Sequence, residues 1–252
     1  MDIAVDKNDN VWIGASDGVW KYDGNKFTLY SSRNTAMPED IVWSIAVDSK
    51  NNIWMASCRV RQGGLVKYDG TNWTAYTPTN SALPVNMIHS IAIDKSDNVW
   101  LALGEYVTQS YLVKISNDKW DVYDENDFGF KPYWLAGIQC DNKNRVLVSI
   151  SYMLSSFMGP HFPYFFIFDG KNTTQLPYGD NISLSETIID REDNVLCFGG
   201  VWIGEQWRPF DFNYDFNGEE YIGNGVWTIE KDVNNRIWLG TENGIYIAYP
   251  SK

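Results

Sequence analysis

The sequence predicts an all-β fold made of about six copies of one four-stranded unit, and three observations support this prediction. A segment of the form I-x-x-D, with Thr in place of Ile in one copy, recurs six times in the 252 residues, with the Asp at positions 6, 48, 94, 141, 190 and 232. Short runs of Val, Ile, Trp and Tyr alternate with Asp-Gly, Asn-Asp and Gly-Gly turns, which is the pattern of strands joined by hairpins. No long segment has the apolar spacing of an amphipathic helix. A period in the forties made of short strands is typical of a β-propeller.

The second copy shows the unit most completely. Its four strands are expected at about 42–47, 52–57, 64–68 and 73–76. Asp48 ends the first strand, where its carboxylate can accept backbone N–H bonds in the hairpin. Asp69-Gly70 predicts the next hairpin, because glycine adopts positive φ without steric cost. Trp54, in the second strand, is expected to pack between neighbouring blades.

We expect one propeller domain spanning 1–252, because a blade buries its faces only against its neighbours. The sixth copy ends after its third strand, so the last blade is expected to lack its outer strand. The expected blades cover approximately 1–31, 42–77, 88–123, 134–176, 184–217 and 225–249.

The composition argues against several classes of function. The net charge is −12, from 20 Lys and Arg against 32 Asp and Glu, which disfavours nucleic acid and anionic lipid as partners. The three cysteines have no C-x-x-C spacing, and there are only two histidines, so no disulfide framework, metal site or cofactor is expected. No signal peptide and no membrane-inserting segment are visible in this chain.

The repeated motif I-x-x-D-x-x-x-N-x-W, followed by K-Y-D-G and T-x-Y, resembles the two-component regulator propeller repeat. The linkers at 34–38 and 80–84 resemble that family's link between blades. The match is close in copies one, two and six, fair in three, and weaker in four and five. The resemblance implies an extracytoplasmic sensor region of a bacterial signalling protein, periplasmic or extracellular. It also implies a signalling protein as a further partner and a glycan as the kind of ligand, and it supplies no catalytic motif.

The copies differ most at one face of the predicted propeller. The connections from the fourth strand to the next blade and from the second to the third strand emerge there, and such variable loops often bind ligands. Aromatic rings beside amide and charged groups suit sugars, which stack on the rings and hydrogen-bond through hydroxyls. The alternative, that the aromatics fill gaps between uneven blades, stays open. The candidate ligand-binding residues are Trp43, His89, Trp134 and Trp227 near the starts of first strands, and Arg59, Arg61, Tyr106, Tyr152, His161, Trp202 and Trp207 in the loops between second and third strands.

These observations favour a non-catalytic sensory propeller that binds an oligosaccharide fragment or another polar small molecule. No G-x-S-x-G motif or nucleotide-binding glycine loop is present. One alternative is a carbohydrate-active enzyme, a glycoside hydrolase or lyase, that uses paired loop carboxylates. Another is a protein–protein interaction scaffold. The carboxylates for the enzyme hypothesis would come from Glu39, Asp40, Glu105, Glu186 and Glu205.

Overall fold

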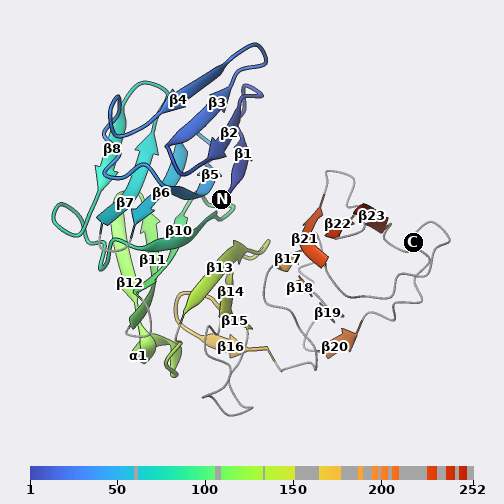
Figure 1. Cartoon of the computed structure of the whole chain (residues 1–252). Helices are drawn as coiled ribbons and strands as arrows, with labels where there is room; N and C mark the ends of the chain where they lie inside the picture. The colour runs from blue at the N-terminus through green and yellow to red at the C-terminus, as the bar shows by residue number, and fades with distance from the viewer. Residues whose placement is uncertain are drawn as a thin grey trace. The chain divides into compact units, whose positions relative to one another are not determined.

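The computed structural model of the chain is built almost entirely of short antiparallel strands (Figure 1). It consists of two compact units, residues 1–157 with 167–173, and residues 158–166 with 174–252. The structure describes residues 1–59, 62–105, 109–132, 134–150 and 165–176, together with the strand segments 187–189, 195–197, 200–203, 206–209, 226–231, 237–241 and 244–248.

Three four-stranded sheets follow one another in the first unit, each in simple meander order. The first contains β1 (Ile3–Val5), β2 (Val11–Gly14), β3 (Val19–Tyr22) and β4 (Phe27–Tyr30). The second contains β5 (Val42–Val47), β6 (Ile53–Arg59), β7 (Gln62–Tyr68) and β8 (Trp73–Tyr76). The third contains β9 (Ile88–Ile93), β10 (Val99–Glu105), β11 (Gln109–Ser116) and β12 (Lys119–Tyr123).

The later part of the chain repeats this pattern. After the short helix α1 (Glu125–Phe128), a fourth sheet contains β13 (Leu135–Cys140), β14 (Val146–Ile150), β15 (Phe165–Phe168) and β16 (Thr173–Gln175). A fifth contains β17 (Thr187–Ile189), β18 (Val195–Cys197), β19 (Gly200–Ile203) and β20 (Gln206–Pro209). The last described sheet has three strands, β21 (Val226–Lys231), β22 (Ile237–Thr241) and β23 (Gly244–Ala248). The predicted all-β repeat with a three-stranded last sheet is confirmed. The single domain spanning 1–252 stays a prediction.

The repeated Asp holds both its hairpin and the Trp of the next strand. Asp6 accepts backbone N–H bonds from Asn8 at 2.8 Å and Asn10 at 3.0 Å, and it accepts the indole Nε1–H of Trp12 at 3.0 Å. Burial acts to raise the pKa of Asp6, but the donated bonds outweigh it and lower the pKa. The hairpin role is confirmed, and the indole bond is an addition that the sequence did not reveal. The same indole bond joins Trp54 to Asp48 and Trp100 to Asp94.

The Trp residues of the second strands pack between sheets, as predicted. Trp12 is 1% exposed and its ring centroid lies 5.8 Å from that of Tyr30 in its own sheet and 5.7 Å from that of Tyr68 in the next. The ammonium of Lys21 lies over the indole, 5.4 Å from its centroid, which adds a cation–π attraction. The cores therefore lie between successive sheets, each closed by an aromatic cluster.

The first strands of neighbouring sheets are tied together by side-chain acceptors. The hydroxyl of Ser44 accepts the N–H of Ile91 at 3.2 Å, and Ser90 likewise accepts the N–H of Ile138 at 3.2 Å. These acceptors stand four residues before the repeated Asp. They fix the first strands of the second, third and fourth sheets against one another near the strand starts, where the candidate aromatics lie.

The two linkers at 34–38 and 80–84, which resemble the family's link between blades, also complete the core. Met37 and Leu83, the fourth residue of each linker, are 4% and 3% exposed. Asn34 and Asn80 fold their linkers by accepting the backbone N–H of Ser31 and Thr77, at 2.8 Å and 2.7 Å. Each linker thus places one apolar side chain against the interface between two sheets.

Candidate functional site

One extra residue interrupts the first strand in four of the sheets, at the end where the candidate aromatics lie. In β9, Ile88 pairs with Leu103 and Ser90 with Ala102, so His89 has no partner across the ladder. Such a β-bulge redirects a side chain and often lies beside binding sites. The bulge recurs at Trp43-Ser44 in β5, Ala136 in β13 and Trp227 in β21.

Trp43 is the most exposed of the aromatic side chains that the structure describes at these positions. Its side chain is 45% exposed, whereas Val42 and Ser44 on either side are buried. Because successive side chains of a strand point to opposite faces, Trp43 lies on the exposed side while its two neighbours are inside. Exposed aromatic rings held by a rigid strand are well suited to stack against a ligand.

His89 and Trp134 form an aromatic pair beside the ladder. Their ring centroids are 4.1 Å apart, and the planes are tilted by 37°. The Nε2 of His89 lies 3.0 Å from the carbonyl oxygen of Gly104 in β10. Burial lowers the pKa of His89, against a smaller opposing effect of this hydrogen bond, so the imidazole is neutral near pH 7.

The structure places the other candidates in different surroundings. Trp202 and Trp207, expected in a loop, lie in β19 and β20 and pair directly with each other across that hairpin. Arg59 ends β6, and Trp227 lies in β21, with only the backbone of both described. Arg61, Tyr106, Tyr152 and His161 lie outside the described residues. A role in binding stays a prediction for all of them.

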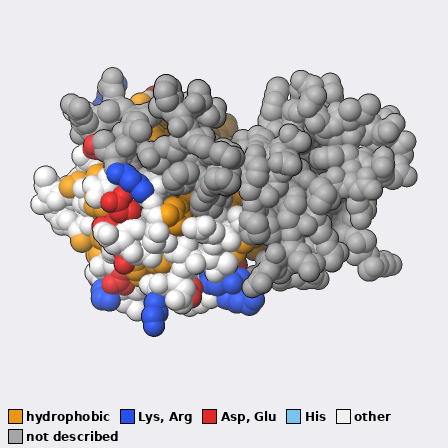
Figure 2. All heavy atoms as spheres, turned by 90° about the horizontal axis from the view of Figure 1, so that it is seen from below, with side chains coloured by type: hydrophobic (Ala, Val, Ile, Leu, Met, Phe, Trp, Pro, Cys, Tyr) orange, Lys and Arg blue, Asp and Glu red, His pale blue; other side chains and the backbone are white. Residues whose placement is uncertain are grey.

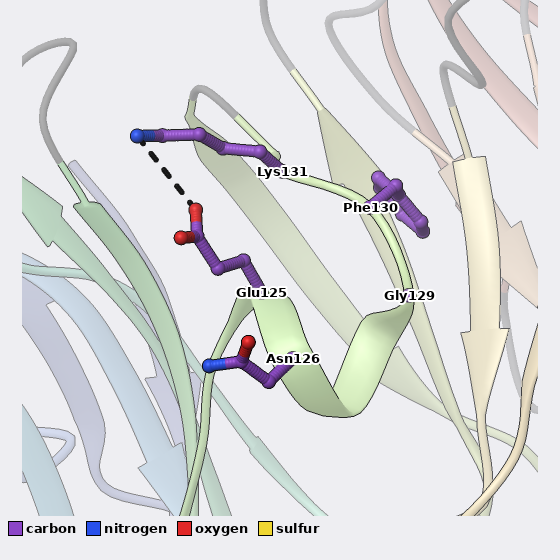
Figure 3. Close-up of a pocket in the computed structure, with 5 residues that line it drawn as sticks. All are labelled: Glu125, Asn126, Gly129, Phe130 and Lys131. Atoms are coloured by element: carbon purple, nitrogen blue, oxygen red, sulfur yellow. Dashed lines mark ion pairs between the residues drawn. The ribbon is translucent and has the colours of Figure 1, made fainter.

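A shallow hollow opens beside α1, on the connection between the third and fourth sheets (Figure 3). It measures about 440 Å³. Figure 3 shows Lys131 and Glu125 reaching toward each other, with Nζ and Oε2 3.7 Å apart, and Phe130 turned the other way. This hollow was not predicted from the sequence. Asp124 and Asp127 form a capping box at the start of α1. The hollow is lined by Glu125, Asn126, Gly129, Phe130 and Lys131.

Two of the carboxylates considered for catalysis have structural partners. Asp40 accepts the backbone N–H of Ser32 at 2.7 Å, and Glu39 accepts the N–H of Asp40 at 3.1 Å. The hydrogen bonds from Ser32 lower the pKa of Asp40. These acids therefore hold the connection between the first two sheets. Glu186 and Glu205 lie outside the described residues.

The described surface mixes charges of both signs. On the face in Figure 2, Lys and Arg side chains lie close to Asp and Glu side chains, with hydrophobic side chains between them. Within the described ranges, no cluster of three or more His, Cys, Asp or Glu could hold a metal ion. No helix of the described chain is long and apolar enough to cross a membrane.

Comparison with solved structures identifies the fold as a β-propeller. The extracellular domain of BT3049 from B. thetaiotaomicron, which is assigned to a hybrid two component system, matches with a TM-score of 0.69 and 18% identity, over 98% of this chain and 33% of that chain. PorZ, a surface component of the type-IX secretion system of Porphyromonas gingivalis, matches with a TM-score of 0.71 and 13% identity, over 98% of this chain and 38% of that chain. An ancestral GH74 enzyme matches with a TM-score of 0.64 and 14% identity, over 98% of this chain and 36% of that chain. The chain thus spans about a third of the length of these structures.

Residues 220–243 match the family model described as two component regulator propeller. This segment belongs to the sixth copy and includes β21 and β22. The chain is therefore a β-propeller that carries the two-component regulator propeller repeat, as its sequence motifs predicted. Comparison with curated proteins gave no match.

Proposed function

We propose that this chain is a non-catalytic, sensory β-propeller that binds a glycan fragment or another polar small molecule at the starts of its first strands. The observation that carries the proposal is the recurring bulge at the starts of the first strands, where Trp43 is 45% exposed and His89 has no partner across the ladder of β9. A packing role alone does not require an exposed indole on a rigid strand. The proposed binding surface consists of Trp43, His89 and Trp134.

The chemistry of this surface suits a sugar. The apolar face of a pyranose ring stacks on indole, while its hydroxyl groups need directional partners. His89 supplies such a partner, because its neutral ring has one acceptor and one donor nitrogen. The side-chain acceptors that tie the first strands together keep these groups in fixed positions, which reduces the entropy lost on binding.

We also propose that the chain acts outside the cytoplasm as one propeller domain and passes its ligand signal to a signalling protein. The support is the family repeat at 220–243 and the fold shared with an extracellular domain assigned to a two component system. The enzyme alternative is not proposed, because the likeness to the GH74 enzyme is one of fold alone and Asp40 and Glu39 hold a connection.

Thermal-shift screening with a panel of neutral and acidic oligosaccharides, followed by calorimetric titration of the hits, tests the proposal. We expect at least one oligosaccharide to raise the melting temperature of the wild-type chain and to lose affinity when Trp43 becomes Ala. No binding across the panel, or binding that Trp43→Ala leaves unchanged, would contradict the proposed site. Phe27→Ala serves as the control, since Phe27 is also exposed but lies on β4.

A further inference from the structure

The hydrogen bond of His89 decides which of its ring nitrogens is available. The Nε2 lies 3.0 Å from the carbonyl oxygen of Gly104, and a carbonyl oxygen only accepts. Nε2 must therefore carry the proton. Because burial lowers the pKa of His89, the ring holds no second proton near pH 7, and Nδ1 is an acceptor with a lone pair.

The carbonyl that fixes this tautomer is itself held in place. Gly104 pairs with Ser110 across the β10–β11 ladder. A Cβ at residue 104 would lie 3.0 Å from the carbonyl oxygen of Gln109 and 3.0 Å from the hydroxyl oxygen of Ser110, which is tighter than ordinary contact. The strand is thus closely packed at this point, and the Gly104 carbonyl keeps the imidazole in one orientation against Trp134.

The acceptor itself disfavours a negatively charged group as its partner. A ligand carboxylate or sulfate at Nδ1 would face a lone pair, whereas a ligand hydroxyl can donate a hydrogen bond to it.

We infer that His89 and Trp134 form a subsite that takes an uncharged pyranose ring, with the ring stacked on Trp134 and its exocyclic hydroxymethyl group donating a hydrogen bond to Nδ1 of His89. This inference rests on the proposed function and adds to it the class of ligand. It makes His89 a specificity-determining residue, which discriminates through an acceptor left unpaired by the wrong ligand. A site that accepts a hydrogen bond from a ligand hydroxyl rejects an analogue without that hydroxyl, because the polar group of the site then has no partner in the complex.

Two matched series of oligosaccharides test the inference. Galactose oligomers and galacturonic acid oligomers differ only in carrying a hydroxymethyl group or a carboxylate at the same carbon. Calorimetric titration of the wild-type chain is expected to show at least tenfold tighter binding of the neutral series, which corresponds to about 1.4 kcal/mol. The same comparison is made with glucose and glucuronic acid oligomers.

Two substitutions test the acceptor role of Nδ1 separately from the donor role of Nε2. His89→Gln keeps an N–H donor for the Gly104 carbonyl and has no acceptor at the place of Nδ1. His89→Asn places a carbonyl oxygen there and gives up the donor. We expect the preference for the neutral series to disappear in His89→Gln and to persist in His89→Asn. If the role of His89 were purely structural, each variant would bind the neutral and the acidic series more weakly by the same factor. The ratio of the two affinities would then stay unchanged.

The outcomes separate this inference from the proposed function. Equal or tighter binding of the acidic series, or a ratio that His89→Gln leaves unchanged, would overturn the subsite while the ligand-binding function stands. Absence of binding to either series in the wild-type chain would overturn the proposed function and the subsite with it. The melting temperatures of both variants show that the compared proteins are folded.

Discussion

The indole Nε1 of Trp12 lies 3.0 Å from Oδ2 of Asp6, and this bond joins the turn after the first strand to the core between two sheets. The carboxylate also accepts two N–H bonds from the hairpin backbone, so one buried side chain fixes the turn and orients the Trp. The arrangement recurs at Asp48 and Asp94. It explains why Asp and Trp keep a fixed separation in these copies.

Replacing this indole should destabilise the fold. Trp12→Phe removes the hydrogen bond to a buried carboxylate and the contact with Lys21, and we expect the free energy of unfolding to fall by about 1–3 kcal/mol. Urea denaturation measures the change. Trp20→Phe is the matched control, since Trp20 is half-buried and its indole donates to the exposed Asp17 at 3.3 Å. Equal losses in the two variants would contradict the role assigned to the Asp–Trp bond.

A glycine before the third strand should also be needed for stability. Gly18 has φ of +137°, and a Cβ there would lie 2.1 Å from the carbonyl oxygen of Tyr30. We expect Gly18→Ala to lower the free energy of unfolding by more than about 1 kcal/mol, because backbone strain and a clash add. Gly24→Ala is the control, with a positive φ of +91° but no atom within 4 Å of the added Cβ. Thermal unfolding measures the change, and an equal fall in the melting temperature of the two variants would contradict the predicted clash.

Acid should weaken the fold through His89. Its pKa in the folded state is lowered by burial from an ordinary value of about 6.5. Between the folded and unfolded pKa values the unfolded chain binds more protons, so the free energy of unfolding rises with pH in that window. The contribution is complete above about pH 6.5 and is lost as the pH falls toward the folded value. Urea denaturation across this range should show that the free energy of unfolding depends less steeply on pH in His89→Gln than in the wild type. Identical slopes in the two proteins would contradict the prediction.

Much of the fold could be predicted from the sequence because the period of the repeated Asp is regular. The Asp-Gly turns and the linkers indicated where strands and connections fall, and the three strand signals of the sixth copy indicated the three-stranded sheet. The bulges could not be predicted, because an extra residue in one strand is defined only by its pairing with the next. Trp43 and His89 stand out in the sequence as variable aromatics, and the strand pairing gives the physical reason why they leave the ladder.

The candidate site was predicted less completely, for reasons that lie in particular residues. Trp202 and Trp207 were expected in a loop, although the two residues Gly204-Glu205 between β19 and β20 are a sequence typical of a β-hairpin turn. The contact between His89 and Trp134 joins the third sheet to the connection before the fourth, and sequence spacing carries no information on such a contact. The same holds for the hydrogen bond that selects the tautomer of His89.

The most direct test of the proposed ligand-binding function is a calorimetric titration of wild-type and Trp43→Ala chains with an oligosaccharide selected by thermal shift. Because Trp43 is 45% exposed, the substitution should lower the free energy of unfolding by less than the roughly 3–5 kcal/mol that truncation of a buried Trp costs. We expect affinity to fall at least tenfold, about 1.4 kcal/mol, in a variant that is still folded at the temperature of the titration. Unchanged affinity, or a loss of stability that matches the loss of binding, would contradict the proposed function and return Trp43 to a packing role.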